Sequence, residues 1–121
     1  MAAGVGLPLE QVFKTLLAIG DRTGPLLVVV PGDSTLDLHA LAPQTGNKRV
    51  EMAPLREVQG ITGYVRGGVS PLATRRPLPV YVDEMALLHD RISISAGLRG
   101  VQLLLAPADL VRAAKAKVVR L

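Results

Sequence analysis

The segment Gly63-Tyr64-Val65-Arg66-Gly67-Gly68-Val69-Ser70-Pro71-Leu72 offers the most chemistry in this chain of 121 residues. It places three glycines and a proline within nine positions, between two apolar segments. Glycine permits positive φ and a close approach of the backbone to a ligand, whereas proline fixes φ and lacks an N–H donor. Such a loop can present main-chain N–H and C=O groups to a substrate. It can equally form a tight turn that binds nothing.

A lysine stands where an apolar helical turn meets an apolar strand. Lys14 lies between Phe13 and the run Thr15-Leu16-Leu17, so we expect its aliphatic stem to be buried. Its ammonium must then reach water, a carboxylate or an anionic ligand, because an unpaired buried charge is costly. From these residues alone, a lysine that extends to water and one that binds an anion both fit. A second small-residue loop, Ser95-Ala96-Gly97 followed by Arg99-Gly100, predicts by itself only a hairpin.

Several conventional catalytic mechanisms find no support in the sequence. The chain has no cysteine, which excludes disulfides, a thiolate nucleophile and thiolate metal ligands. Neither His39 nor His89 has a neighbouring histidine or carboxylate at metal-ligand spacing, so we expect no metal site. No serine lies in a Gly-x-Ser-x-Gly motif, and no phosphate-binding or dinucleotide-binding glycine motif is present.

Positive charge gathers around the glycine-rich segment. The formal net charge is +4 at pH 7, and ten of the 14 cationic residues are arginines, which contact phosphate in a bidentate manner that lysine cannot match. Arg66, Arg75 and Arg76 flank the segment. A basic rim of this kind predicts an anionic ligand, and a merely solvated face is the alternative. Aromatic residues make up only 2% of the chain, too few for a base-stacking platform.

Length and composition predict one folded domain over residues 1–121, since 49% of the residues are hydrophobic and 20% are charged. No apolar run approaches the roughly 20 residues that span a bilayer. The first residues lack the basic region of a secretory signal. We therefore expect a cytoplasmic protein that does not enter a membrane.

Hydrophobic patterning predicts strands that interleave irregularly with short helices. We expect a hairpin of strands 14–19 and 26–30, strands at 49–52 and 79–82, a half-buried strand at 91–95, a buried strand at 101–105 and an edge strand at 118–121. Helices are expected at 35–42 after a cap in Pro31-Gly32-Asp33-Ser34, at 54–59 with an end at Gly60 or Gly63, after Asp83 through residue 88, and after Pro107. Hairpins within such an order favour a mixed sheet over a doubly wound parallel one.

In combination and in this order, several segments closely resemble the YbaK/ProX family of free-standing aminoacyl-tRNA deacylases, which are related to the editing insertion of bacterial prolyl-tRNA synthetase. The resemblance runs from about Leu9 to the C-terminus. The segments that carry it are Phe13-Lys14-Thr15-Leu16-Leu17, Lys48-Arg49-Val50-Glu51-Met52-Ala53, residues 62–72, Val80-Tyr81-Val82-Asp83-Glu84, residues 95–100 and Ala106-Pro107-Ala108-Asp109-Leu110.

This resemblance implies a fold and an activity. The fold is an α/β (α+β-like) single domain with a mixed, curved, barrel-like sheet surrounded by helices. The activity is hydrolysis, in trans, of the ester that joins a wrong amino acid to tRNA, typically Cys or Ala on tRNA(Pro), with no metal or other cofactor. Such an ester is already activated, so a site needs only to place water and to stabilise the developing oxyanion.

The resemblance also assigns roles to residues. It makes Lys14 catalytic, together with the backbone of Gly67 and the terminal ribose hydroxyl of the tRNA. The expected substrate-binding residues are Thr15, Gly68, Ser70, Pro71, Ser95 and Gly97. The expected tRNA-binding residues are Arg66, Arg75, Arg76 and Arg99.

Two departures from the family pattern keep a second hypothesis open. Family members usually carry a further N-terminal helix and strand with aromatic pocket residues, and Ala73 stands where glycine is common. The alternative is a catalytically silent module of the same fold that binds tRNA or a synthetase, such as prolyl-tRNA synthetase. A homodimer in which a second copy covers an exposed sheet is a further expectation.

Overall fold

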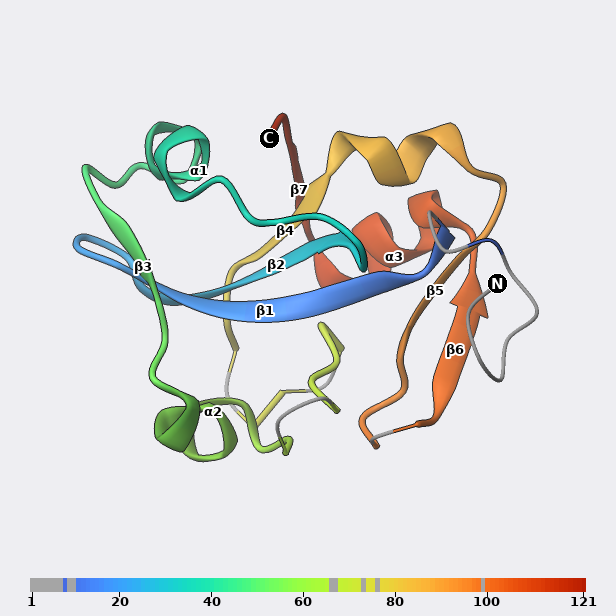
Figure 1. Ribbon diagram of the computed structural model, residues 1–121, viewed down its shortest axis with the longest axis horizontal. Coiled ribbons are helices and arrows are strands. Elements are labelled where there is room, and N and C mark those ends of the chain that lie inside the picture. The colour runs from blue at the N-terminus through green and yellow to red at the C-terminus, as the bar shows by residue number, and fades with distance from the viewer. Residues whose placement is uncertain (1–7, 9–10, 66–67, 73, 76, 99) are drawn as a thin grey trace.

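The computed structural model describes residues 8, 11–65, 68–72, 74–75, 77–98 and 100–121, and every structural statement below concerns these residues (Figure 1). The elements in chain order are β1 (Phe13–Gly20), β2 (Gly24–Pro31), α1 (Leu38–Gln44), β3 (Val50–Met52), α2 (Leu55–Thr62), β4 (Val80–Asp83), the 3-10 helix η2 (Glu84–Leu88), β5 (Ile92–Ser95), β6 (Gln102–Leu105), α3 (Pro107–Ala114) and β7 (Lys117–Val119).

Five strands form one mixed sheet in the order β3-β1-β2-β4-β7. β1 pairs antiparallel with β2 and β3, while β4 pairs parallel with β2 and β7. β5 and β6 form a separate antiparallel pair. The predicted mixed α/β architecture is confirmed. Over the described residues, however, the sheet is open, with β3 and β7 at its two edges, and it does not close into a barrel.

Helices cover both faces of this sheet, as Figure 1 shows. On one face, Leu17 and Val82 pack in a core with Val58 of α2 and Leu110 of α3. On the other face, Val28 and its neighbours pack against Leu41 and Ala42 of α1. β2 is buried on both sides, which matches its run of apolar, β-branched residues. No helix among the described residues is long and apolar enough to cross a membrane.

The buried side-chain amide of Asn47, in the connection between α1 and β3, forms hydrogen bonds with the turn between β1 and β2. Asn47 Oδ1 accepts hydrogen bonds from the backbone N–H groups of Arg22 (2.9 Å) and Thr23 (3.0 Å). Its Nδ2 donates to Thr45 Oγ1 (2.8 Å) and Thr23 Oγ1 (3.1 Å). A Cβ at Gly20 would clash with this amide, so the strand needs glycine there. These contacts hold the turn of the β1–β2 hairpin against the connection between α1 and β3.

One predicted helix start differs from the structure, and one predicted helix end is confirmed. α1 begins at Leu38, not at residue 35, because Asp37 Oδ1 accepts the Ala40 N–H (3.0 Å) as its N-terminal cap. The Ser34 N–H instead donates to the Pro31 C=O (3.0 Å), which extends the turn after β2. α2 continues past Gly60 to Thr62, and Gly63, one of the two predicted ends, caps it with a left-handed φ of 84° that suits glycine.

The burial predicted for the last hairpin is wrong for both strands. All four residues of β5 are buried, although the alternation of Ile and Ser predicts a half-buried strand. In β6, by contrast, Leu103 and Leu104 are 40% and 44% exposed, although the apolar run predicts a buried strand. Ser93 of β5 forms a bridge with Val12, the residue before β1, and all of β5 is buried, whereas β6 pairs with no described strand other than β5.

Candidate active site

A cavity of about 470 Å³ lies along β1, with further walls from the β3–α2 connection and from the β5–β6 hairpin. Most of its lining is apolar, including Phe13, Leu17, Met52, Leu55 and Val69. The polar residues that line it are Lys14, Thr15, Ser95 and Gln102. The structure therefore brings together three residues that the sequence predicts for the site, Lys14, Thr15 and Ser95.

The backbone of β1 opens onto this cavity at Thr15. The Leu17 C=O accepts the Ala53 N–H (3.0 Å), so the peptide groups of Leu17 face away from β2. In an antiparallel ladder this direction alternates, so the peptide groups of Thr15 also face away from β2. The ladder with β3 reaches only to Ala18, and the bridge to β5 lies at Val12. The edge of β1 between these two contacts presents the Thr15 N–H and C=O to the cavity.

The Thr15 side chain adds an unpaired hydroxyl to the same place. Thr15 is 9% exposed, and its buried Oγ1 has no hydrogen-bond partner among the residues that the structure describes. Leaving a buried hydroxyl unpaired costs about 1–3 kcal/mol, so such groups are rare in folded proteins. Thr15 therefore offers a hydrogen-bonding group that the described residues leave unused.

Lys14 is partly buried, as its apolar surroundings predict. Neighbouring side chains of a strand point to opposite faces of the sheet, so the side chains of Lys14 and Thr15 leave β1 on different faces. In the strand register Lys14 is paired with Val30 of β2. Both residues line the cavity because it runs along the edge of the strand. Lys14 makes no ion pair with another described residue. Lys14 therefore contributes to the cavity lining a residue that no described carboxylate neutralises.

The glycine-rich segment meets the cavity through Val69. Gly68 donates its N–H to the Val65 C=O (2.9 Å). Ser70 is buried, and its Oγ accepts the Leu72 N–H (3.2 Å), so this hydroxyl fixes the loop. Gly68, Ser70 and Pro71 are not among the described residues that line the cavity, and Pro71 lines a separate one. Gly67 lies outside the described residues.

Tyr64 joins the glycine-rich segment to the β5–β6 hairpin. Its hydroxyl donates to the Leu72 C=O (2.6 Å). A Cβ on Gly97 would lie 2.9 Å from the Tyr64 ring, and Gly97 has a φ of +101°. The Gly97 N–H donates to Ser95 Oγ (3.2 Å). The described contacts of Gly97 thus position Ser95 and Tyr64, and Gly97 itself is not among the described lining residues.

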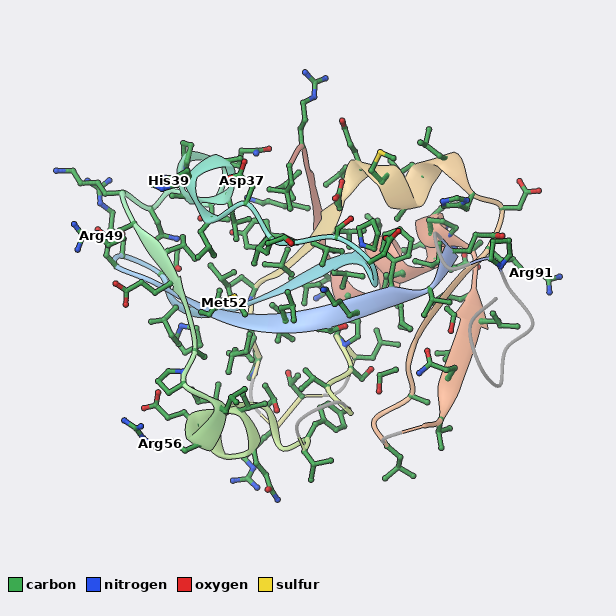
Figure 2. The ribbon with its side chains drawn as sticks, in the orientation of Figure 1. Asp37, His39, Arg49, Met52, Arg56 and Arg91 are labelled. Carbon is green, nitrogen blue, oxygen red and sulfur yellow. The ribbon has the colours of Figure 1, made fainter. Side chains whose placement is uncertain are left out.

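The predicted basic rim is only partly described. Arg75 is exposed, and its N–H donates to the Thr62 C=O (2.9 Å), which places it at the end of α2. Arg66, Arg76 and Arg99 lie outside the described residues. Arg56 is also exposed and projects outward from α2, the helix whose first residue lines the cavity (Figure 2).

Sequence reasoning missed Met52 and Gln102 as cavity residues. Met52 lies at the end of β3, and Gln102 begins β6. A signal for Gln102 was present, since it is the only polar residue of the run Val101-Gln102-Leu103-Leu104-Leu105. Among the described residues, no group of three His, Cys, Asp or Glu could hold a metal ion.

An apolar cavity with an orphan hydroxyl, open peptide groups and a lysine at its border can bind a small acyl group and stabilise negative charge that develops on it. The fold and site thus define an α/β domain with a mostly apolar cavity that suits a small acyl group. A family model described as "Aminoacyl-tRNA editing domain" matches residues 1–113. The chain belongs to this family of aminoacyl-tRNA editing domains.

Two curated relatives are named as deacylases. The chain is 44% identical over 111 residues to EbsC of Enterococcus faecalis, named as a candidate Cys-tRNA(Pro)/Cys-tRNA(Cys) deacylase, and the match covers 92% of this chain and 68% of that protein. It is 30% identical over 95 residues to the multifunctional Ser/Thr-tRNA deacylase ProXp-y of Escherichia coli K12. That match covers 78% of this chain and 57% of the relative, so the chain spans little more than half of ProXp-y.

Solved structures share the fold. One is described as a candidate trans-editing enzyme for prolyl-tRNA synthetase; it matches with a TM-score of 0.88 and 30% identity over 96% of this chain and 73% of its own. A second, the hypothetical protein APE2540, matches with a TM-score of 0.87 and 30% identity over 95% of this chain and 76% of its own.

Proposed function

We propose that this protein is an aminoacyl-tRNA deacylase that acts in trans and removes a wrong amino acid from the 3′ end of a tRNA. The observation that carries the proposal is the orphan hydroxyl of Thr15 in an apolar cavity that Lys14 borders. The names of the two relatives support the same reaction, one for cysteine and the other for serine and threonine. The cavity is sized for a small aminoacyl group, not for a nucleic-acid stem.

The chemistry is hydrolysis of an ester. A water oxygen forms a bond to the ester carbonyl carbon, and the bond from that carbon to the ribose oxygen breaks. One proton of the water passes to the ribose oxygen, so the products are a free amino acid and an uncharged tRNA end. In this scheme Lys14 stabilises the negative charge that develops on the carbonyl oxygen, and the family resemblance assigns the Gly67 backbone to the same step.

Thr15 and Ser95 hold the substrate in this proposal. The Thr15 hydroxyl supplies a hydrogen bond that no described protein group takes up. Ser95 Oγ accepts from Gly97, which leaves its own O–H free to donate toward the cavity. Gly68, Ser70, Pro71 and Gly97 act indirectly, because they shape the two loops that border the cavity.

The tRNA itself is held mainly by charge. Arg75 is the described member of the proposed basic rim, which includes Arg66, Arg76 and Arg99, and phosphate contacts of this kind weaken as salt rises. The proposal places the protein in the cytoplasm, where aminoacyl-tRNA is made and used. Association with prolyl-tRNA synthetase and formation of a homodimer are further parts of it, and analytical ultracentrifugation with and without the synthetase tests both.

The deciding experiment is to incubate the protein at micromolar concentration with tRNA(Pro) charged with Cys or with Ala and to follow loss of the ester. We expect hydrolysis well above that in buffer for at least one of the two substrates. If neither ester is lost faster than in buffer, while the tRNA still binds, the protein is a binding module and the proposed function is wrong.

A further inference from the structure

A hydrogen-bonded pair of side chains spans the β5–β6 hairpin beside the cavity. Ser93 is fully buried, and its hydroxyl donates to Gln102 Oε1 (2.8 Å). Gln102 lines the cavity and lies directly opposite Ser95 in the strand register. Since alternate residues of a strand share a face, Ser93, Ser95 and Gln102 lie on one face of the hairpin. They form a polar strip in an otherwise apolar part of the cavity wall.

The contact with Ser93 decides what Gln102 can offer to a ligand. A carboxamide has one acceptor oxygen and two N–H donors on its nitrogen. The oxygen is engaged by the buried Ser93 hydroxyl, so the two Nε2–H donors remain for other partners. Because Ser93 is held within β5, which is buried along its whole length, it provides a fixed anchor for a residue on the more exposed strand β6.

We propose that Gln102, positioned by Ser93, determines specificity by donating a hydrogen bond to the side chain of the bound amino acid. The acceptor is the hydroxyl or thiol group bonded to Cβ of that amino acid. The site therefore favours Ser, Thr and Cys over Ala, which has no such group. This inference rests on the proposed function and specifies its substrate class. A site with such polar groups disfavours an apolar analogue, because the analogue leaves those groups without a partner.

The test uses probes that bind but are not hydrolysed, 3′-serylamino-adenosine and 3′-alanylamino-adenosine, in which an amide replaces the ester. Their affinities are measured by NMR titration of the full chain. We expect the wild type to bind the seryl probe about tenfold more tightly, the scale of one hydrogen bond. Gln102→Met should abolish most of this preference, and Ser93→Ala should reduce it.

The double variant Ser93→Ala/Gln102→Met separates specificity from folding. Gln102→Met alone leaves the buried Ser93 hydroxyl unpaired and is expected to melt at a lower temperature, whereas removing both partners is close to neutral. The double variant should therefore melt near the wild type and still bind both probes equally. Gln59→Met, on the exposed side of α2, is the matched control and should keep the full preference.

Equal affinity of the wild type for the two probes, including no measurable binding of either, overturns the inference. It is also overturned if the folded double variant keeps the wild-type preference. Neither result depends on turnover. Failure of the proposed function would instead be seen as persistence of the ester on charged tRNA, so the two failures are distinguishable.

Discussion

Replacing Thr15 with valine should make the protein more stable and less active. Valine keeps nearly the same shape but removes the buried Oγ1, which has no partner among the described residues. Burying an unpaired hydroxyl costs about 1–3 kcal/mol. We expect the variant to gain about 1 kcal/mol in unfolding free energy, the lower end of this cost. For a chain of this size that gain raises Tm by roughly 3–6 °C.

The same substitution should slow deacylation about tenfold, since it removes one hydrogen bond to the substrate. Thermal melting and ester hydrolysis are measured on the same preparation. Thr45→Val is the matched control, because Thr45 is also buried but its Oγ1 donates to the Ala42 C=O (2.9 Å) and accepts from Asn47 Nδ2 (2.8 Å). It should lose about 1–3 kcal/mol of stability.

The two valine variants must therefore shift Tm in opposite directions. A Thr15→Val protein that melts below the wild type would show that its hydroxyl is paired in the free protein. One that hydrolyses substrate at the wild-type rate would show that the hydroxyl does not contact the substrate. Either result would refute the assignment of Thr15 as a binding residue.

Further substitutions test other parts of the molecule. Lys14→Ala should lower the deacylation rate at least ~100-fold, the scale for loss of one charge-stabilising group. The control Lys48→Ala, at an exposed position, should keep the wild-type rate. A folded, fully active Lys14→Ala protein would contradict the proposed role of Lys14. Gly97→Ala should lower the unfolding free energy by about 1–3 kcal/mol, because the added Cβ meets the Tyr64 ring and the residue has a positive φ. Gly60→Ala, in a helix with open space around the residue, should raise it by about 0.5–1 kcal/mol. Equal Tm shifts in thermal melting would refute this contrast. Burial raises the pKa of the Asp83 carboxyl, so the folded state favours its protonated form and stability declines as pH rises through that raised pKa. The Tm advantage of Asp83→Asn should accordingly grow from pH 3 to pH 7, and a constant difference would argue against the shift.

Local signals in the sequence were enough for elements whose pattern involves only neighbours. The β1–β2 hairpin follows from two apolar runs on either side of a polar turn, and Asp83 caps the next helix as predicted through the Met85 N–H (3.1 Å). The start of α1 was not determined in this way, because Ser34 and Asp37 both suit a cap. In the structure Asp37 is the cap, and Leu41 packs with Val28 and Val30 of the sheet.

Burial of β5 and β6 depended on tertiary contacts that periodicity does not record. Ser93 and Ser95 alternate with isoleucines as in a half-exposed strand, yet Ile92 and Ile94 lie in the core and the serines are buried as well. The motif-based part of the site was predictable for Lys14, Thr15 and Ser95, which meet at one cavity. For Gln102 the sequence offered only its polarity within an apolar run, and its hydrogen bond with the buried Ser93 hydroxyl across the hairpin is visible only in the structure.

The buried amide of Asn47 has a consequence for hydrogen exchange. Arg22 and Thr23 lie in an exposed turn, where backbone amides ordinarily exchange with solvent within the time of local fraying. Here both N–H groups donate to Asn47 Oδ1, and Asn47 is itself held between Thr45 and Thr23. These two amides can therefore exchange only when the link between α1 and β3 separates from the hairpin. Their protection should match that of the interior of the sheet, so that a surface turn reports on the opening of the core.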